Sequence, residues 1–162
     1  FGNLDRISDV CAEAGVKACV HPHWGTMIQN DSEIRKMLDE SKVALCLDTG
    51  HMVCGGCDPE AIVKEYPGRT VIVHAKDVHK EMTDKLLPSE ITWSQGVKAG
   101  MFAPIGEGDI NFGTIVAELD KAGFDGYYVL EQDIMIDEEP PAGGGPKANA
   151  EKSLKALQKL AG

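Results

Sequence analysis

The sequence predicts an α/β fold built on a parallel β-sheet, and three observations carry this prediction. Four short apolar runs of the kind found in doubly buried strands are spaced along the chain. Amphipathic helical segments separate them, and this alternation is typical of right-handed βαβ units. Each run ends in ionisable residues, and parallel α/β proteins bind ligands at the carboxyl ends of their strands. We therefore expect one site assembled from four strand ends.

The elements follow from periodicity and from helix start and stop signals. Asn30 or Asp31 is expected to cap one helix, and Asp58 with Pro59 begins another. Gly123 is expected to end a third helix. The expected elements are a helix over 4–14, a strand over 16–21, a helix over 31–40, a strand over 43–47, a helix over 59–66, a strand over 70–73, a helix over 112–122, a strand over 127–130 and a helix over 148–160. Residues 78–109 form a long, partly polar excursion between them.

Composition and charge narrow the function classes. With 43% hydrophobic and 26% charged residues in 162, the chain is typical of a globular domain. Its apolar runs are far shorter than a membrane helix of about 18 residues, so no membrane partner is expected. The net charge of −10 disfavours a nucleic-acid partner. Five cysteines and no secretory signal favour the cytoplasm. Because the chain begins at Phe1 rather than methionine, we expect the natural N-terminus upstream.

The strand ends hold two imidazoles and two carboxylates. His21, Asp48, His74 and Glu131 each follow an apolar run that delivers them to the same rim. This donor set suits a divalent ion such as Mn2+, Co2+ or Zn2+. Any one of them alone is more simply an ordinary polar residue at a strand end. Together, the four favour a metal site.

Neighbouring residues are candidates for substrate contacts. His51, on the turn after the second strand, either binds a substrate hydroxyl or carries a proton, or else has a capping or surface role. Strand alternation places Lys76 on the side of His74, as a substrate-facing cation, and points Asp77 away as a structural partner. The same alternation puts His23 beside His21.

Two further motifs are set aside. The G-x-G in residues 104–109 does not directly follow a strand, so it does not predict a dinucleotide site. Cys54 and Cys57 form a lone C-x-x-C in a loop, without the second pair that a zinc knuckle requires. We interpret this pair as incidental.

Five motifs together resemble a known family. They are V-H-P-H-W-G-T at 20–26, C-L-D-T-G-H at 46–51, V-H-A-K-D-V at 73–78, P-I-G-E-G-D-I-N-F at 104–112 and Y-V-L-E-Q-D at 128–133. Their order and spacing resemble the sugar phosphate isomerase/epimerase family, and the branch that they resemble most is that of the inosose dehydratases. The resemblance covers residues 16–133.

The resemblance implies a xylose isomerase-like (β/α)8 TIM barrel, of which this chain holds strands five to eight. Residues 1–162 would then be a single segment, the C-terminal half of one barrel domain. An open half-barrel leaves sheet edges and an inner face uncovered. Either four further strands complete the barrel or two copies of the chain associate and close on each other.

The resemblance also implies roles for single residues. Asp48, His74 and Glu131 match three metal ligands of the related ketose epimerases, and His51 matches a substrate-contacting histidine. His21 takes the place of a glutamate ligand. Epimerases of this type use two carboxylates as a matched acid and base, and this chain retains one of them. The substitution tilts the interpretation towards a dehydratase.

The reaction expected on this basis is β-elimination from a small polyhydroxylated ketone or sugar. The metal acts as a Lewis acid while Glu131 or a nearby histidine takes the proton next to the carbonyl. Lys76 stabilises the developing oxyanion, and His51 or His23 protonates the departing hydroxyl. The alternatives are a ketose or ketose phosphate isomerase or epimerase using the same enolate, and a metal-binding fragment without turnover.

Overall fold

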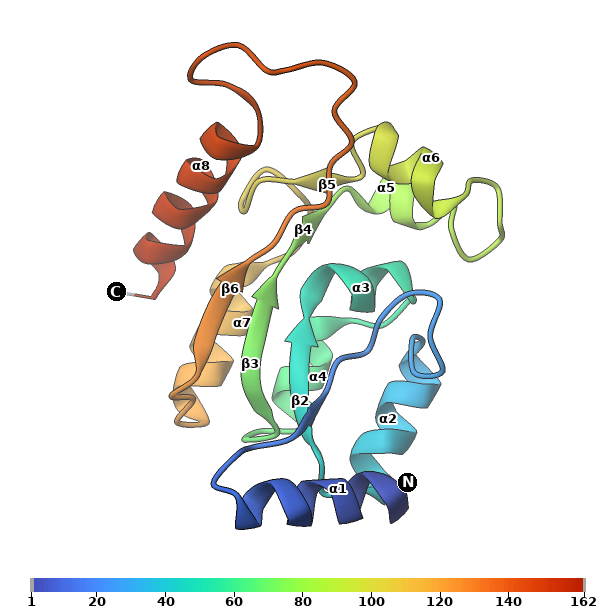
Figure 1. Cartoon of the computed structure of the whole chain (residues 1–162), viewed down its shortest axis with the longest axis vertical. Helices are drawn as coiled ribbons and strands as arrows, with labels where there is room; N and C mark the ends of the chain where they lie inside the picture. Colours follow the sequence, from blue (N-terminus) through green and yellow to red (C-terminus); the bar gives the residue numbers. More distant parts are fainter. Residues whose placement is uncertain (1, 162) are drawn as a thin grey trace.

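The computed structural model describes residues 2–161, with Phe1 and Gly162 outside the described residues, and its centre is a sheet of four parallel strands (Figure 1). The strands are β1 (Cys19–Val20), β2 (Ala44–Asp48), β3 (Thr70–Ala75) and β6 (Tyr127–Leu130), paired in the order β1-β2-β3-β6. Each neighbouring pair is parallel. All four carboxyl ends therefore meet at one edge of the sheet, as predicted.

Helices connect the strands, and α4 and α7 lie behind the sheet in the view of Figure 1. The helices are α1 (Gly2–Glu13), α2 (Asp31–Glu40), α3 (Thr49–Cys54), α4 (Pro59–Glu65), α5 (Lys80–Thr83), α6 (Trp93–Lys98), α7 (Phe112–Lys121) and α8 (Gly145–Leu160). None of the helices within residues 2–161 has the length and apolarity that a bilayer crossing requires.

Local capping explains where the predicted helices begin. The side chain of Asn30 accepts a hydrogen bond from the backbone N–H of Glu33, and the Glu33 side chain accepts one from the Asn30 backbone in return. Asp58 caps α4, with Pro59 in its first turn. After α7, Gly123 adopts a φ of +73°, a conformation that favours glycine. These boundaries are confirmed.

The hydrophobic core fills the space between the rear face of the sheet and the helices. Leu45 and Leu47 of β2 and Val73 of β3 are fully buried there. Helices α2, α4 and α7 contribute Ile34, Met37, Leu38, Ile62, Val63, Ile115, Val116 and Leu119. The front face of the sheet, towards the viewer in Figure 1, is not covered by helices in this view.

Four expectations about the elements are corrected. The strand expected over 16–21 pairs only at Cys19 and Val20, because extended residues become a strand only where a neighbour pairs with them. The turn after β2 is the helix α3, whose last residue, Cys54, was expected in a loop. Helix α8 begins at Gly145, three residues before its expected start. The predicted apolar face of α1 is largely exposed, because it packs on the core mainly through Leu4.

The excursion over 78–109 is ordered by a small antiparallel pair and by one buried carboxylate. Strand β4 (Asp77–Val78) pairs with β5 (Phe102–Ala103), and α5 and α6 lie between them. The carboxylate of Asp77 accepts hydrogen bonds from the backbone N–H groups of Gly106 at 2.8 Å, Gly108 at 3.0 Å and Ile110 at 3.2 Å. It also accepts one from the N–H of Val78 at 2.9 Å. Asp77 thus anchors the loop that the G-x-G motif forms.

We expect Asp77→Ala to lower the free energy of unfolding by about 3 kcal/mol, because it leaves several buried N–H groups without an acceptor. Urea denaturation measures this difference. The exposed Asp125 offers a matched control, and Asp125→Ala should stay within about 0.5 kcal/mol of the parent protein. Equal stability of the two variants would contradict the anchoring role.

Candidate active site

Asp48 links the end of β2 to the start of α3 and faces the centre of the candidate site. It is fully buried. Its Oδ1 accepts a hydrogen bond from the backbone N–H of His51 at 2.9 Å and so caps α3. Its Oδ2 lies 3.0 Å from His21 Nε2, and 3.7 Å from both His74 Nδ1 and Lys76 Nζ. Oδ1 therefore binds the backbone of α3, while Oδ2 faces the side chains of the site.

Lys76 follows β3 and is also fully buried. Its Nζ lies 2.9 Å from Glu131 Oε1 and 3.3 Å from Asp133 Oδ2. The backbone of Lys76 is held by Thr49, whose hydroxyl donates to its carbonyl at 2.7 Å and accepts from its N–H at 3.1 Å. A Cβ at Gly50 would lie 2.6 Å from Lys76 Cγ. The path of this lysine side chain therefore requires glycine at position 50.

His74 and Glu131 meet between β3 and β6. His74 Nδ1 lies 2.8 Å from Glu131 Oε2. This buried nitrogen nevertheless has no partner with hydrogen-bond geometry among the described residues. Close approach without hydrogen-bond alignment is the arrangement expected of donor atoms that converge on an ion.

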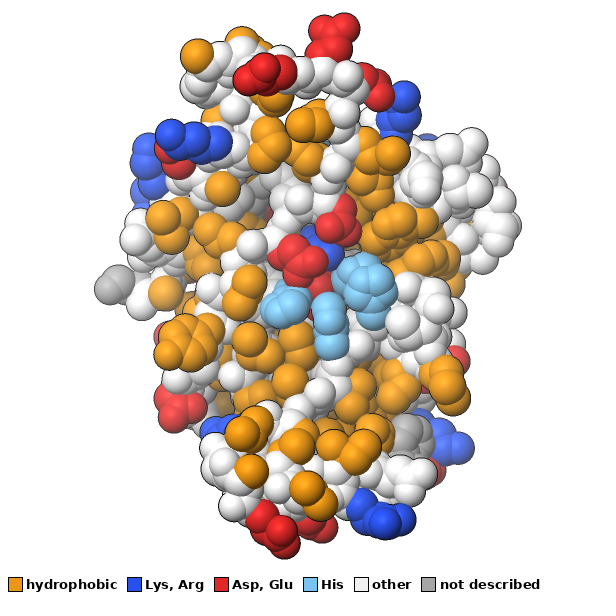
Figure 2. Space-filling model, viewed as in Figure 1, with side chains coloured by type: hydrophobic (Ala, Val, Ile, Leu, Met, Phe, Trp, Pro, Cys, Tyr) orange, Lys and Arg blue, Asp and Glu red, His pale blue; other side chains and the backbone are white. Residues whose placement is uncertain are grey.

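Three histidines and two tryptophans form a wall beside these groups. The rings of His23 and His51 lie 3.6 Å apart between centroids, and His21 lies 5.4 Å from His23. His51 stacks on Trp93 at 5.1 Å with an interplanar angle of 5°, and Trp24 stacks on Trp93 from further out at 6.3 Å. Figure 2 shows histidines and acidic side chains gathered at the centre of the front face, with hydrophobic side chains around them.

The tautomers of two histidines follow from their partners. His23 Nδ1 lies 2.8 Å from the backbone carbonyl oxygen of Trp24, which only accepts, so Nδ1 carries the proton and Nε2 is left to exchange one. His51 Nε2 lies 3.2 Å from Lys76 Nζ, and its Nδ1 lies 3.3 Å from the N–H of Trp24. A neutral imidazole accepts at one nitrogen only. The backbone N–H of Trp24 donates to Nδ1, so Nδ1 is that acceptor in this structure.

Burial and neighbouring charges lower the pKa values of some groups in the cluster and raise those of others. Burial, with a smaller contribution from the nearby Lys76 charge, lowers the pKa of His51 to about 3, against the opposing effect of Asp48. Burial alone would raise the pKa of Asp48, but His21, His74 and Lys76 together bring it well below its usual range. The neighbouring carboxylates of Asp48 and Glu131 raise the pKa of His74. Burial opposes the charge of Lys76, yet its three carboxylate neighbours keep its pKa above the ordinary value.

The donor atoms of Asp48, His74 and Glu131 all lie within 4.8 Å of one another. His21 joins this group through its contact with Asp48. Carboxylate and imidazole donors suit first-row divalent ions, and the unaligned Nδ1 of His74 is consistent with such use. The residues present therefore fit a divalent metal ion.

Comparison with known proteins assigns the chain to a family. The family model described as "Xylose isomerase-like TIM barrel" matches residues 2–160. The chain belongs to this family. An inosose dehydratase from Geobacillus thermodenitrificans is 35% identical over 162 residues, which cover 98% of this chain and 53% of that protein. The chain thus spans about half the length of the curated relatives that it matches.

Two solved structures share the fold of this chain. A probable 3-DHS dehydratase from Bacillus anthracis superposes with a TM-score of 0.66 at 16% identity, over 99% of this chain and 55% of that one. The IOLI protein, determined with a bound zinc atom, superposes with a TM-score of 0.63 at 16% identity, over 98% of this chain and 53% of that one. The family that the sequence motifs indicated is confirmed.

The structure adds three residues that were not predicted to the seven predicted site residues that it brings together, which are His21, His23, Asp48, His51, His74, Lys76 and Glu131. Asp133 was noted only as part of a motif, yet it contacts Lys76. Trp93 comes from the excursion, where no periodic pattern marked it. Cys46 lies two residues before Asp48 on the same strand. Strand alternation, already applied to His21 and His23, would have pointed it to the same face.

We expect His51 to stay neutral when the metal-free protein is titrated from pH 8 to pH 5, because burial lowers its pKa to about 3. The same imidazole in an unfolded chain titrates near 6.5. The unfolded state then binds more protons below that pH, so this residue makes folding less stable as the pH falls. Nitrogen-15 NMR of labelled histidine reports the protonation state directly. Full protonation of His51 by about pH 5 would contradict the burial argument.

Proposed function

We propose that the protein to which this chain belongs is a metal-dependent lyase that removes water from a small polyhydroxylated ketone. The single observation that carries the proposal is the convergence of Asp48, His74 and Glu131 within 4.8 Å, beside the buried ammonium of Lys76. A set of ligands for a divalent ion next to a fixed positive charge suits reactions in which negative charge develops on a carbonyl oxygen. The inosose dehydratase names of several relatives support this substrate class.

Asp48, His74 and Glu131 are the proposed metal ligands, and His21 is the proposed fourth. When bound there, Mn2+, Co2+ or Zn2+ supplies a Lewis acid that polarises the carbonyl of the substrate. Asp48 is well suited to this role because its Oδ1 is engaged in capping α3, which fixes the direction of Oδ2. The low pKa of Asp48 keeps that oxygen ionised at neutral pH.

Proton removal next to the carbonyl is assigned to Glu131. Lys76 lies 2.9 Å from its Oε1, and this contact orients the carboxylate. The same ammonium stabilises the enolate oxygen that develops. His51 remains neutral, and its Nε2 lies 3.2 Å from Lys76 Nζ.

Protonation of the departing hydroxyl is assigned to His23. Its Nδ1 donates to the Trp24 carbonyl, which orients the ring and leaves Nε2 as the site of proton exchange. His23 is half-buried, so a proton is readily replaced from solvent. A histidine on one side and a carboxylate on the other divide the acid and base roles of an elimination.

We further propose that the four strands are strands five to eight of a barrel in which residues 1–162 form a single segment. A TIM barrel has eight parallel strands, and this sheet contributes four. Strand alternation places Tyr127 and Val129 on the face of Glu131, where they are 80% and 38% exposed. Four further strands, from the same polypeptide or from a second copy, would cover this face.

All five cysteines are free thiols, which suits the cytoplasm.

Replacing Lys76 tests the electrostatic part of the proposal. In the full-length protein, Lys76→Met should lower kcat by about 10²–10³-fold, the usual effect of removing one donor to a developing oxyanion. Lys85 is exposed, so Lys85→Met is the matched control and should leave kcat unchanged. Both variants are first checked for folding by thermal denaturation. A folded Lys76→Met protein with the parent kcat would contradict the assignment.

The reaction type is tested by product and isotope together. The full-length protein is incubated in deuterated buffer with an inosose-like cyclic ketone, and ultraviolet absorbance and deuterium uptake are followed. We expect an unsaturated dione that absorbs in the ultraviolet. Stereoinversion with deuterium uptake and no such product would replace the lyase by an isomerase or epimerase. Metal binding with no reaction of either kind would indicate a metal-binding protein without turnover.

A further inference from the structure

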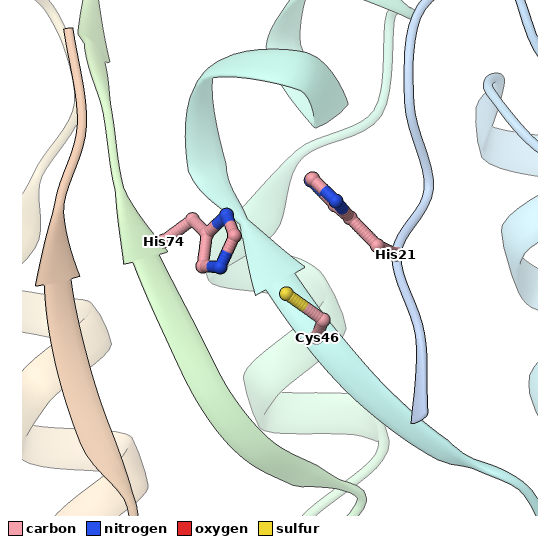
Figure 3. A group of neighbouring side chains, drawn as sticks. All are labelled: His21, Cys46 and His74. Carbon is pink, nitrogen blue, oxygen red and sulfur yellow. The ribbon is translucent and has the colours of Figure 1, made fainter. Parts of the chain in front are cut away.

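We propose that Cys46 is a sulfur ligand of the metal centre, forming with His21 and His74 a second coordination set for a thiophilic divalent ion such as Zn2+ or Co2+. The proposal rests on the metal site proposed above and extends its ligand set. Figure 3 shows the three side chains pointing towards one another from three neighbouring segments of the sheet. Their donor atoms all lie within 4.8 Å of one another.

The strand register produces this arrangement. Cys46 and Asp48 are separated by one residue on β2, so their side chains point to the same face. Asp48 pairs with His74 on β3, and His21 follows the end of β1 on the other side of β2. Ligands of a tetrahedral ion lie about 3.5 Å apart, since its bonds are about 2.0 Å to nitrogen and 2.3 Å to sulfur. Small side-chain rotations would bring the three donors to that spacing.

The surroundings of Cys46 distinguish it from the other buried cysteines. A buried free cysteine usually acts as a small apolar side chain. Cys54 and Cys57 fit that description, because both belong to the hydrophobic core. Cys46 is only 3% exposed, yet it lies outside that core cluster and faces two imidazoles instead.

The two ligand sets share His21 and His74, and each would bind a different class of ion, hard or soft. Asp48 and Glu131 offer hard oxygens, which suit Mn2+, whereas Cys46 offers a soft sulfur, which suits Zn2+ and Co2+. Burial raises the pKa of the free Cys46 thiol to about 12. The ion would therefore displace the thiol proton, which passes to solvent as the sulfur–metal bond forms.

Cobalt is the probe for this inference, because a thiolate ligand gives Co2+ an intense charge-transfer band in the near ultraviolet. The metal-free full-length protein is titrated with Co2+ as wild type, Cys46→Ser and Cys57→Ser. We expect the band in wild type and in Cys57→Ser, and its loss in Cys46→Ser. Removing a group that only hydrogen-bonds a metal ligand typically lowers metal affinity by about 10–100-fold. We therefore expect Cys46→Ser, which removes a ligand itself, to lower the preference for Zn2+ over Mn2+ by at least about tenfold.

The outcomes separate this inference from the proposed function. Co2+ binding to wild type without a charge-transfer band would overturn the sulfur ligand and leave the carboxylate site standing. No Co2+ binding to wild type would overturn both. X-ray absorption of the zinc-loaded wild type provides a second measurement that needs no variant. A sulfur atom at about 2.3 Å from zinc is expected, and a shell of nitrogen and oxygen alone would overturn the inference.

Discussion

The charge of the fully buried Lys76 imposes the main constraint on this fold. An ammonium removed from water costs several kcal/mol unless carboxylates and hydrogen bonds compensate for it. Asp48, Glu131 and Asp133 supply that compensation from the ends of two different strands. The carboxyl ends of β2 and β6 are thereby tied to the end of β3, and Gly50 provides the space through which the lysine passes. The ion pairs that form the site therefore also hold the strand ends together at this edge.

Three carboxylates around one ammonium leave an excess of negative charge. The negative charges of Asp48 and Glu131 raise the pKa of His74, whereas His21, His74 and Lys76 keep the pKa of Asp48 low against the effect of its burial. A divalent cation would balance the same excess. In the proposal above, a hard ion would use the carboxylate ligands and a softer ion would use Cys46, with His21 and His74 common to both sets.

The two faces of the sheet have different tasks. The rear face packs Leu45, Leu47 and Val73 against helices, and this dry core fixes the strand register. Because side chains alternate along a strand, that register also determines which residues reach the front. The buried carboxylate of Asp77 adds a second anchor, which holds the loop after β5 and so orders the excursion that brings Trp93 against His51.

Periodicity and capping signals determined much of this structure from the sequence alone. The strand at 127–130, the helix at 31–40 and the starts of α4 and α7 match their predicted positions, because they depend on residues a few positions apart. The alternation of strands and helices likewise placed His21, Asp48, His74 and Glu131 at one edge. Their chemical roles remain proposals.

The tertiary structure alone decided which distant residues touch. The stacking of Trp93 on His51, the contact of Asp133 with Lys76 and the grouping of Cys46 with two histidines join residues at least 25 positions apart. Local pattern can place a side chain on one face of a strand, as for Cys46, but it does not show which distant residue that side chain meets. The exposure of the apolar face of α1 was hidden for the same reason. A sequence shows that a face is apolar, whereas only packing shows what covers it.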